Sequence, residues 1–170
     1  MEISASTSRN TSASSPGDRE RGRAIKILVD SSPLVATIDG GDSAHDFAAP
    51  LLAHLRRRAV IPIPVLVEVD HIVASRVGAA AARRFLHAVG GGVHDVAYLS
   101  PGLLRRAVEL DNQYADLNLG LADTCVMAIA ERHEMPILTF DFTDFRATES
   151  ATGPWRLAID EHTYMRAMQR

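Results

Sequence analysis

The sequence predicts an α/β fold, a three-layer sandwich in which helices cover a mostly parallel central sheet. Short segments rich in Ile, Leu and Val alternate along the chain with longer segments that have helical spacing of apolar residues. The first short segment is nearly all apolar, which is typical of a strand covered on both faces. A length of 170 residues, 46% of them hydrophobic and 23% charged, suits a single globular domain.

The first half of the predicted domain contains two strands and three helices. Asp42 and Ser43 are residue types that cap a helix, and Pro64 fits the first turn of the next one. Gly78 then separates the second helix from the third. The strands are expected at 25–29 and 59–63, and the helices from about residue 43, over 64–75 and over 79–88.

The second half continues the alternation with three further strands. They are expected at 93–99, 136–139 and 155–159. Two helices are expected between the first two of these strands, at 101–110 and 121–133. The three glycines at 90–92, before the predicted strand at 93–99, are expected to form a turn. They match neither a phosphate-binding loop nor a dinucleotide fingerprint.

Residues 1–23 differ from the rest of the chain and are expected to form a disordered leader. They are mostly Ser, Thr, Ala, Arg and Gly without periodicity, so they cannot bury enough apolar surface to become ordered. They also lack the apolar core of a secretory signal. The predicted organisation is therefore a leader followed by one domain over 24–170.

The charge, cysteine and apolar content exclude several classes of protein. A net charge of −3 excludes a basic nucleic-acid coat protein. The single cysteine, Cys125, cannot form an internal disulfide, which favours a reducing compartment. No apolar run approaches the roughly 18 residues that a membrane span needs. We therefore expect a cytoplasmic protein without membrane segments.

Acidic residues collect where the predicted strands end. Asp30 follows the first strand, Glu68 lies early in the helix after the second, and Asp123 opens a later helix. Asp141 follows the fourth strand, with Asp144 three residues further on. Because ligands of open α/β sheets bind at the carboxyl ends of the strands, we expect these acids to meet at one edge.

Such a cluster of carboxylates needs a compensating charge. Two unit charges 4 Å apart repel by about 4 kcal/mol at an effective dielectric constant near 20. Oxygen ligands select a hard cation, Mg²⁺ or Mn²⁺, which can acidify water and neutralise charge on a phosphoryl group. A second interpretation stays open, in which Asp30 and Asp123 only cap helices.

Four segments of the chain, taken in order, resemble the PIN-domain family, and most closely its VapC-type toxins. The first pairs a strand with Asp-Ser-Ser, the second contains Glu68, the third runs through Asp123, and the fourth ends at Asp141. They lie at 27–32, 64–69, 119–124 and 137–141. The resemblance covers roughly residues 25–159.

The resemblance implies a metal-dependent endoribonuclease, the toxin of a toxin–antitoxin pair, that leaves 5′-phosphate and 3′-hydroxyl ends. It implies a homodimer and a VapB-like antitoxin as partners, with RNA as the substrate. The implied acidic tetrad is Asp30, Glu68, Asp123 and Asp141, of which the three aspartates would ligate Mg²⁺ or Mn²⁺. Supporting roles are expected for Asp144, Ser32 and Thr139, the latter two as hydrogen-bond donors to carboxylates or phosphate or as turn residues.

RNA also requires positive charge outside the acidic cluster. Candidate phosphate contacts are the arginine groups at 56–58, 83–84 and 105–106. Aromatic residues make up only 5% of the chain, which favours recognition of phosphates and shape over base stacking. The chain departs from the family in having Phe142 and Thr143, where basic residues are common.

Other interpretations fit the sequence less well. A receiver domain needs a lysine late in the sheet, whereas Lys26 is the only lysine of the chain. A haloacid-dehalogenase-type phosphatase needs a second aspartate two residues after Asp30, where Ser32 stands. DNA-directed flap nucleases carry larger insertions than this chain allows. The alternative from another class is a non-catalytic PIN-like module that binds RNA or an antitoxin.

Overall fold

A parallel sheet forms the centre of the structure, a computed structural model that describes residues 25–169. The leader predicted over 1–23 lies outside the described residues. The strands are β1 (Ile27–Val29), β2 (Ala59–Pro62), β3 (Asp95–Ala97) and β4 (Ile137–Leu138). They form one sheet in the order β3-β2-β1-β4, and every neighbouring pair is parallel.

Eight α-helices and two short 3₁₀ helices connect the strands within the described residues. The helices of the first half are α1 (Ser31–Ile38), α2 (His45–Leu55), α3 (Ile63–Arg76) and α4 (Ala79–Gly90). Those of the second half are α5 (Pro101–Gln113), α6 (Leu121–His133), α7 (Phe142–Ala147) and α8 (Glu161–Met168). The 3₁₀ helices are η2 (Arg56–Arg58) and η3 (Ala115–Leu117).

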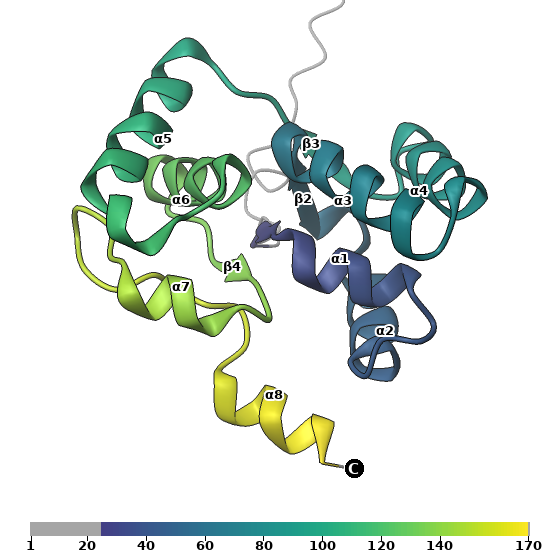
Figure 1. Ribbon diagram of the computed structural model, residues 1–170. Helices are drawn as coiled ribbons and strands as arrows, with labels where there is room; N and C mark the ends of the chain where they lie inside the picture. Colours follow the sequence, from purple (N-terminus) through teal and green to yellow (C-terminus); the bar gives the residue numbers. More distant parts are fainter. Residues whose placement is uncertain (1–24, 170) are drawn as a thin grey trace, which may run out of the picture.

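The helices cover both faces of the sheet and confirm the predicted three-layer sandwich (Figure 1). Helices α1 to α4 lie on one side, whereas α5 and α6 pack against each other on the other side. The handedness of the connections explains this division. The chain moves from β1 through β2 to β3 in one direction and then crosses back past β1 to β4, so right-handed crossovers place the last helices on the opposite face.

The core is built around β1, β4 and α6. Leu28 and Val29 of β1 and both residues of β4 are completely buried, as expected for strands covered on two faces. Helix α6 is buried almost continuously from Ala122 to Ala130. The position of Asp123 at the start of α6 is therefore fixed by the packing of the whole helix.

All five predicted helices are present, and the four that were given both bounds begin and end within three residues of them. The expected cap at 42–43 is wrong, because α2 begins at His45 and Asp42 Oδ1 instead accepts a hydrogen bond from the Ala44 amide. Asp42 therefore closes a turn before the helix. No helix within residues 25–169 is long and apolar enough to cross a membrane.

The predicted strand at 155–159 is reduced to one parallel bridge, between Leu157 and Ile137. Two backbone hydrogen bonds hold it, from the Ile137 amide to the Arg156 carbonyl and from the Ala158 amide to the Ile137 carbonyl, at 2.8 and 2.7 Å. The two residues of β4 offer too short an edge for a longer ladder.

Helices α1, α7 and α8 were not predicted, because they have 8, 6 and 8 residues and periodicity over such lengths is weak. Packing supports α1 and α7, which bury Leu34, Val35 and Phe145 among others. None of the residues of α8 is fully buried.

Candidate metal centre

The strand order reverses between β1 and β4, and we call the carboxyl ends of these two strands the crevice. These strands are neighbours, but the chain leaves β1 toward β2 and reaches β4 only after crossing back from β3. Ligands of open α/β sheets bind at such a switch in strand order. Asp30 follows β1 and Asp141 lies just beyond β4, so both stand at this crevice.

Asp30 is the most deeply buried carboxylate of the described chain, with 1% of its surface exposed. Its Oδ2 accepts a 2.8 Å hydrogen bond from Thr139 Oγ1. Its Oδ1 is buried and has no hydrogen-bond partner. Although Asp30 occupies the N-cap position of α1, its side chain makes no capping hydrogen bond. A helix cap therefore does not account for this buried carboxylate.

Burial raises the pKa of Asp30 from 3.8 to about 7, and the charges of Asp123 and Glu68 contribute to the increase. Removing a carboxylate from water disfavours its charged form, and neighbouring carboxylates add repulsion. The three acids therefore influence one another through space, although they come from β1, α3 and α6. A cation beside Asp30 would relieve both effects.

Asp123 serves two purposes at the start of α6. Its Oδ2 accepts a 2.9 Å hydrogen bond from the Gly120 amide, which forms part of a capping box. Burial raises its pKa, and the charges of Glu68, Asp144 and Asp141 raise it further. Asp123 therefore caps α6 through Oδ2, as one interpretation of the sequence expected. Its Oδ1 takes no part in the cap and is left for another partner.

Glu68 reaches the cluster from α3, which packs directly against α6. It is half-buried in a helix whose residues Val65 and Val69 are completely buried. The apolar neighbours of Glu68 in the sequence therefore reflect the face that α3 buries. Glu68 lies near enough to Asp30 and Asp123 for its charge to raise the pKa of both.

The two acids after β4 differ in their surroundings. Asp141 is exposed at the N-cap of α7 and makes no capping hydrogen bond, whereas Asp144 is half-buried in the first turn. Burial raises the pKa of Asp144, followed by the charge of Asp141. Asp144 also affects the pKa of Asp123 more strongly than Asp141 does. Asp144 therefore lies close enough to Asp123 to act on it, as two acids of the implied tetrad also do.

Ser32 and Thr139 connect the two strand ends that carry the aspartates. Besides bonding Asp30, Thr139 Oγ1 accepts a 2.9 Å hydrogen bond from the Asp141 amide. Ser32 Oγ accepts one of 3.0 Å from the Phe140 amide and lies 3.4 Å from Asp30 Oδ2. Both hydroxyls therefore fix the positions of carboxylates.

The donor set fits a hard divalent cation. The unpartnered Oδ1 of Asp30 is a buried anionic oxygen for which a cation would supply the missing partner. All the acidic side chains at the crevice offer oxygen, the ligand type that Mg²⁺ and Mn²⁺ prefer. Among residues 25–169, however, no three His, Cys, Asp or Glu side chains already converge closely enough to hold a metal ion.

Several arginines predicted as phosphate contacts bind other groups of the protein. The group at η2 precedes β2 and so lies at the amino ends of the strands, opposite the crevice, where Arg57 and Arg58 donate to backbone carbonyls. Arg106 pairs with Glu131 through two nitrogens. Arg83, Arg84 and Arg105 are exposed.

Cys125 and His71 add nothing to the cluster. Cys125 is completely buried, and burial raises the pKa of its thiol to about 11, so it behaves as a small apolar residue. His71 is exposed on α3.

An aromatic cluster beside the crevice escaped the sequence analysis. Tyr164 of α8 stacks on Phe140 with ring centroids 4.7 Å apart, and Phe142 lies 5.5 Å from Tyr164. Phe47 of α2 completes the group at 6.0 Å from Tyr164. Composition shows only that aromatics are few. The sequence signal that could have revealed the cluster is the closeness of Phe140 and Phe142 to Asp141.

The parallel α/β sandwich and the carboxylates at its strand ends define the class of protein. Residues 27–150 match the PIN domain family, which is more than half of the chain. The chain belongs to the PIN domain family, and the resemblance seen in the sequence is confirmed.

Individual relatives are VapC proteins. The chain is 27% identical over 128 residues to Ribonuclease VapC26 from Mycobacterium tuberculosis (strain ATCC 25618 / H37Rv). The matched residues make up 75% of this chain and 95% of that relative. The structure of this chain is similar to the crystal structure of Mycobacterium tuberculosis VapC20, described as a sarcin-ricin loop cleaving toxin. The TM-score is 0.66 at 22% identity. That match covers 72% of this chain and 95% of VapC20.

A further similar structure is VapBC2 from Rickettsia felis bound to a DNA fragment from its promoter. The TM-score is 0.55 at 15% identity, and the match covers 72% of this chain and 92% of the other. At these identities the two solved structures establish the fold.

Proposed function

We propose that this protein is a metal-dependent endoribonuclease and the toxin of a toxin–antitoxin pair. The observation that carries the proposal is the buried Asp30 carboxylate, whose Oδ1 lacks a partner and whose pKa is raised by burial and by neighbouring acids. The similarity to Ribonuclease VapC26 supports RNA as the substrate. The proposed products carry 5′-phosphate and 3′-hydroxyl ends.

In the proposed mechanism, Asp30, Asp123 and Asp141 hold Mg²⁺ or Mn²⁺, either directly or through water. The bound ion would acidify a water molecule and neutralise charge on the phosphoryl group. Glu68 holds a second ion or orients the attacking water, and Asp144 supplies a further carboxylate near Asp123. Thr139 keeps Asp30 Oδ2 in place by its hydrogen bond, and Oδ1, which has no partner, would be the oxygen that holds the ion.

The protein contributes no covalent nucleophile in this mechanism. Water attacks the phosphorus, and the 3′-oxygen of the preceding nucleotide leaves with a proton. The RNA 2′-hydroxyl takes no part, which distinguishes the products from the cyclic phosphates of metal-free ribonucleases. The acidic crevice binds RNA only when cations compensate its charge, because phosphates and carboxylates repel each other.

A VapB-like antitoxin is the proposed protein partner, and a homodimer is the proposed assembly. The similar solved structures include a toxin-antitoxin complex from Klebsiella pneumoniae and the VapBC2 structure, which supports this proposal. Co-purification with the product of the adjoining gene tests the antitoxin, and the molar mass in solution tests the dimer. A monomer that retains no partner contradicts both.

The activity is tested by incubating the protein with total RNA in Mg²⁺, Mn²⁺ or EDTA and mapping the ends of the fragments. Asp30→Asn removes the charge of the buried carboxylate. Glu134→Gln is a matched control, because Glu134 is an exposed acid at the opposite end of α6 from Asp123. We expect metal-dependent cuts with 5′-phosphates from the wild type and Glu134→Gln, and none from Asp30→Asn.

Two other results have clear meanings. If folded, metal-loaded wild-type protein leaves all RNA intact but binds it, the chain is the non-catalytic PIN-like module of the alternative interpretation. If Asp30→Asn, purified free of other nucleases, produces the same metal-dependent cuts as the wild type, Asp30 is not required. Either result refutes the proposed mechanism.

A further inference from the structure

A surface hollow of about 420 Å³ adjoins the candidate metal centre. Two residues of the centre, Ser32 and Asp141, form one end of it. The start of α7 and one face of α8 form the rest. The complete lining is Ser32, Phe140, Asp141, Phe142, Thr143, Glu161, Tyr164 and Met165. Because Ser32 Oγ lies 3.4 Å from Asp30 Oδ2, the hollow opens directly beside the buried carboxylate.

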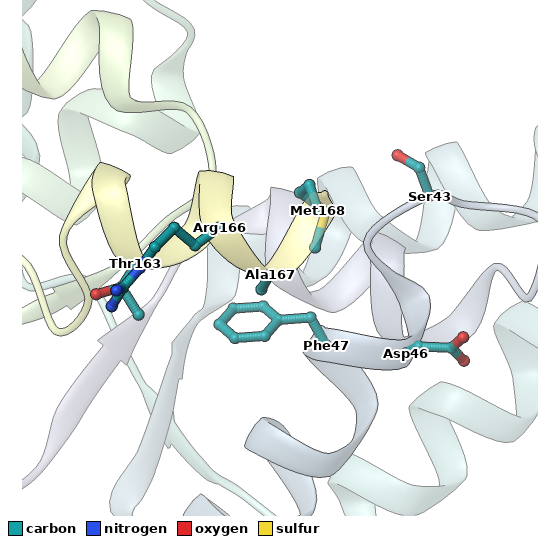
Figure 2. Close-up of a pocket in the computed structure, with 7 residues that line it drawn as sticks. All are labelled: Ser43, Asp46, Phe47, Thr163, Arg166, Ala167 and Met168. Atoms are coloured by element: carbon teal, nitrogen blue, oxygen red, sulfur yellow. The ribbon is translucent and has the colours of Figure 1, made fainter. Parts of the chain in front are cut away.

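The wall formed by α8 (Glu161–Met168) lies beyond the PIN match, which ends at residue 150. The aromatic cluster holds α8 in place, with Tyr164 stacked on Phe140. Figure 2 shows the opposite side of the helix, where the ring of Phe47 lies close to Ala167. Arg146 of α7 also pairs with Glu161 at the start of α8.

The lining selects an uncharged, flat group rather than a phosphate. Tyr164 and Met165 supply aromatic and thioether surface over the buried Phe142, and Met165 is 48% exposed. Asp141 and Glu161 supply negative charge, and none of the lining residues is Arg, Lys or His. Glu161 is already paired with Arg146 of α7, so the lining itself offers a phosphate no cationic side chain. A nucleobase meets apolar side chains and finds acceptors for its amino groups.

We propose that this hollow binds a nucleobase of single-stranded RNA, from a nucleotide adjoining the scissile phosphate. The inference rests on the proposed ribonuclease function and extends it to substrate selection. A phosphate at the carboxylate cluster places the next base within reach of the hollow, since Ser32 and Asp141 border both. Met165 and Tyr164 are then specificity-determining residues contributed by α8.

The test scans a single abasic residue through a short single-stranded RNA that the wild type cleaves. Removing a stacked base costs about 5- to 150-fold in binding or cleavage. We expect a loss in this range at one position next to the cut, and losses of less than about twofold at positions farther away. The same oligonucleotides with a non-hydrolysable linkage at the cut give the corresponding affinities.

The side chain is tested with Met165→Ala and Met165→Glu, each measured against the intact and the abasic RNA. Leu104→Ala is the matched control, because Leu104 is an apolar residue of α5 with 44% exposure, close to the 48% of Met165. In the two Met165 variants, removal of the critical base should reduce binding or cleavage much less than it does in the wild type. In Leu104→Ala the reduction should equal that of the wild type. This comparison is a double-mutant cycle between side chain and base.

The outcomes separate this inference from the proposed function. Cleavage with equal base dependence in the wild type and both Met165 variants overturns the nucleobase site and leaves the nuclease intact. The hollow would then be available to a protein side chain. If the wild type cleaves no RNA, the proposed nuclease function is refuted. The affinities for RNAs with an abasic residue at successive positions then decide whether the hollow binds a nucleobase. Absence of both cleavage and binding overturns both.

Discussion

Thr139 Oγ1 donates a 2.8 Å hydrogen bond to Oδ2 of Asp30, although the two residues are 109 positions apart in the sequence. The bond joins the end of β4 to the end of β1, the two strands that flank the crevice. It occupies one oxygen of the buried carboxylate and leaves the other without a partner. The geometry of the candidate centre depends on this contact.

Replacing Thr139 with Val should expose that dependence. The change removes the donor to Asp30 and also the acceptor of the Asp141 amide. We expect a loss of about 1–3 kcal/mol in the free energy of unfolding at neutral pH. The pKa of Asp30 should rise further, because the bond from Thr139 lowers it in the wild type. Denaturant unfolding and titration of the Asp30 carboxyl group by NMR measure the two effects.

Thr37→Val is the control for this substitution. Thr37 is half-buried, whereas Thr139 is buried, and the Thr37 hydroxyl donates only to the Pro33 carbonyl within α1. Its loss should leave the titration of Asp30 unchanged. Equal Asp30 titrations in the wild type and Thr139→Val would contradict the role assigned to Thr139.

The stability of the metal-free protein should depend on pH through Asp30. Its pKa is about 7 in the folded protein against an ordinary value of 3.8, so the folded state holds the proton more tightly than the unfolded state. The stabilisation from the bound proton is complete at low pH and is lost as the pH rises from about 4 through about 7. Asp30→Asn, which cannot ionise, should be more stable than the wild type above pH 7, by up to about 4 kcal/mol.

This prediction is checked by denaturant unfolding in EDTA between pH 4 and pH 8. The difference in free energy between Asp30→Asn and the wild type should shrink toward pH 4. Glu134→Gln, at an exposed site, should follow the wild type across the whole range. A constant difference between Asp30→Asn and the wild type would show that Asp30 titrates normally.

Divalent cations should stabilise the folded protein at neutral pH. A ligand that binds only the folded state adds about 2.7 kcal/mol at a concentration one hundred times its dissociation constant. We expect Mn²⁺ to raise the melting temperature of the wild type and of Glu134→Gln. Asp30→Asn and Asp123→Asn should lose most of this increase, because each removes a proposed ligand. Equal increases in all four proteins would place the bound ion elsewhere.

Asp144 should matter at least as much as Asp141. Asp144 is half-buried and acts more strongly on Asp123, whereas Asp141 is exposed. We expect Asp144→Asn to lower RNA cleavage by about 10- to 100-fold, the loss typical of groups that support a metal site. Asp141→Asn measured under the same conditions provides the comparison. Full activity of Asp144→Asn would restrict the functional set to the four acids implied by the resemblance.

The outline of the fold could be predicted because local patterns control it. Helix α6 begins and ends at the predicted residues, since thirteen residues with strong periodicity leave little ambiguity. The strand at 155–159 could not be predicted reliably, because its pairing depends on how much edge β4 offers. Helix α8 was missed because no local pattern shows which aromatic side chains it will contact.

The sequence alone determined that this is a parallel α/β protein with acids at its strand ends, and it carried the resemblance to the PIN-domain family. Those features lie in contiguous segments, where spacing and residue type are sufficient. Only the tertiary structure decided that Asp30 is buried with a free oxygen, that Asp144 is more buried than Asp141, and that α8 gathers aromatic residues beside the cluster. Burial and through-space contact between distant segments depend on the packing of the whole chain, which no local pattern contains.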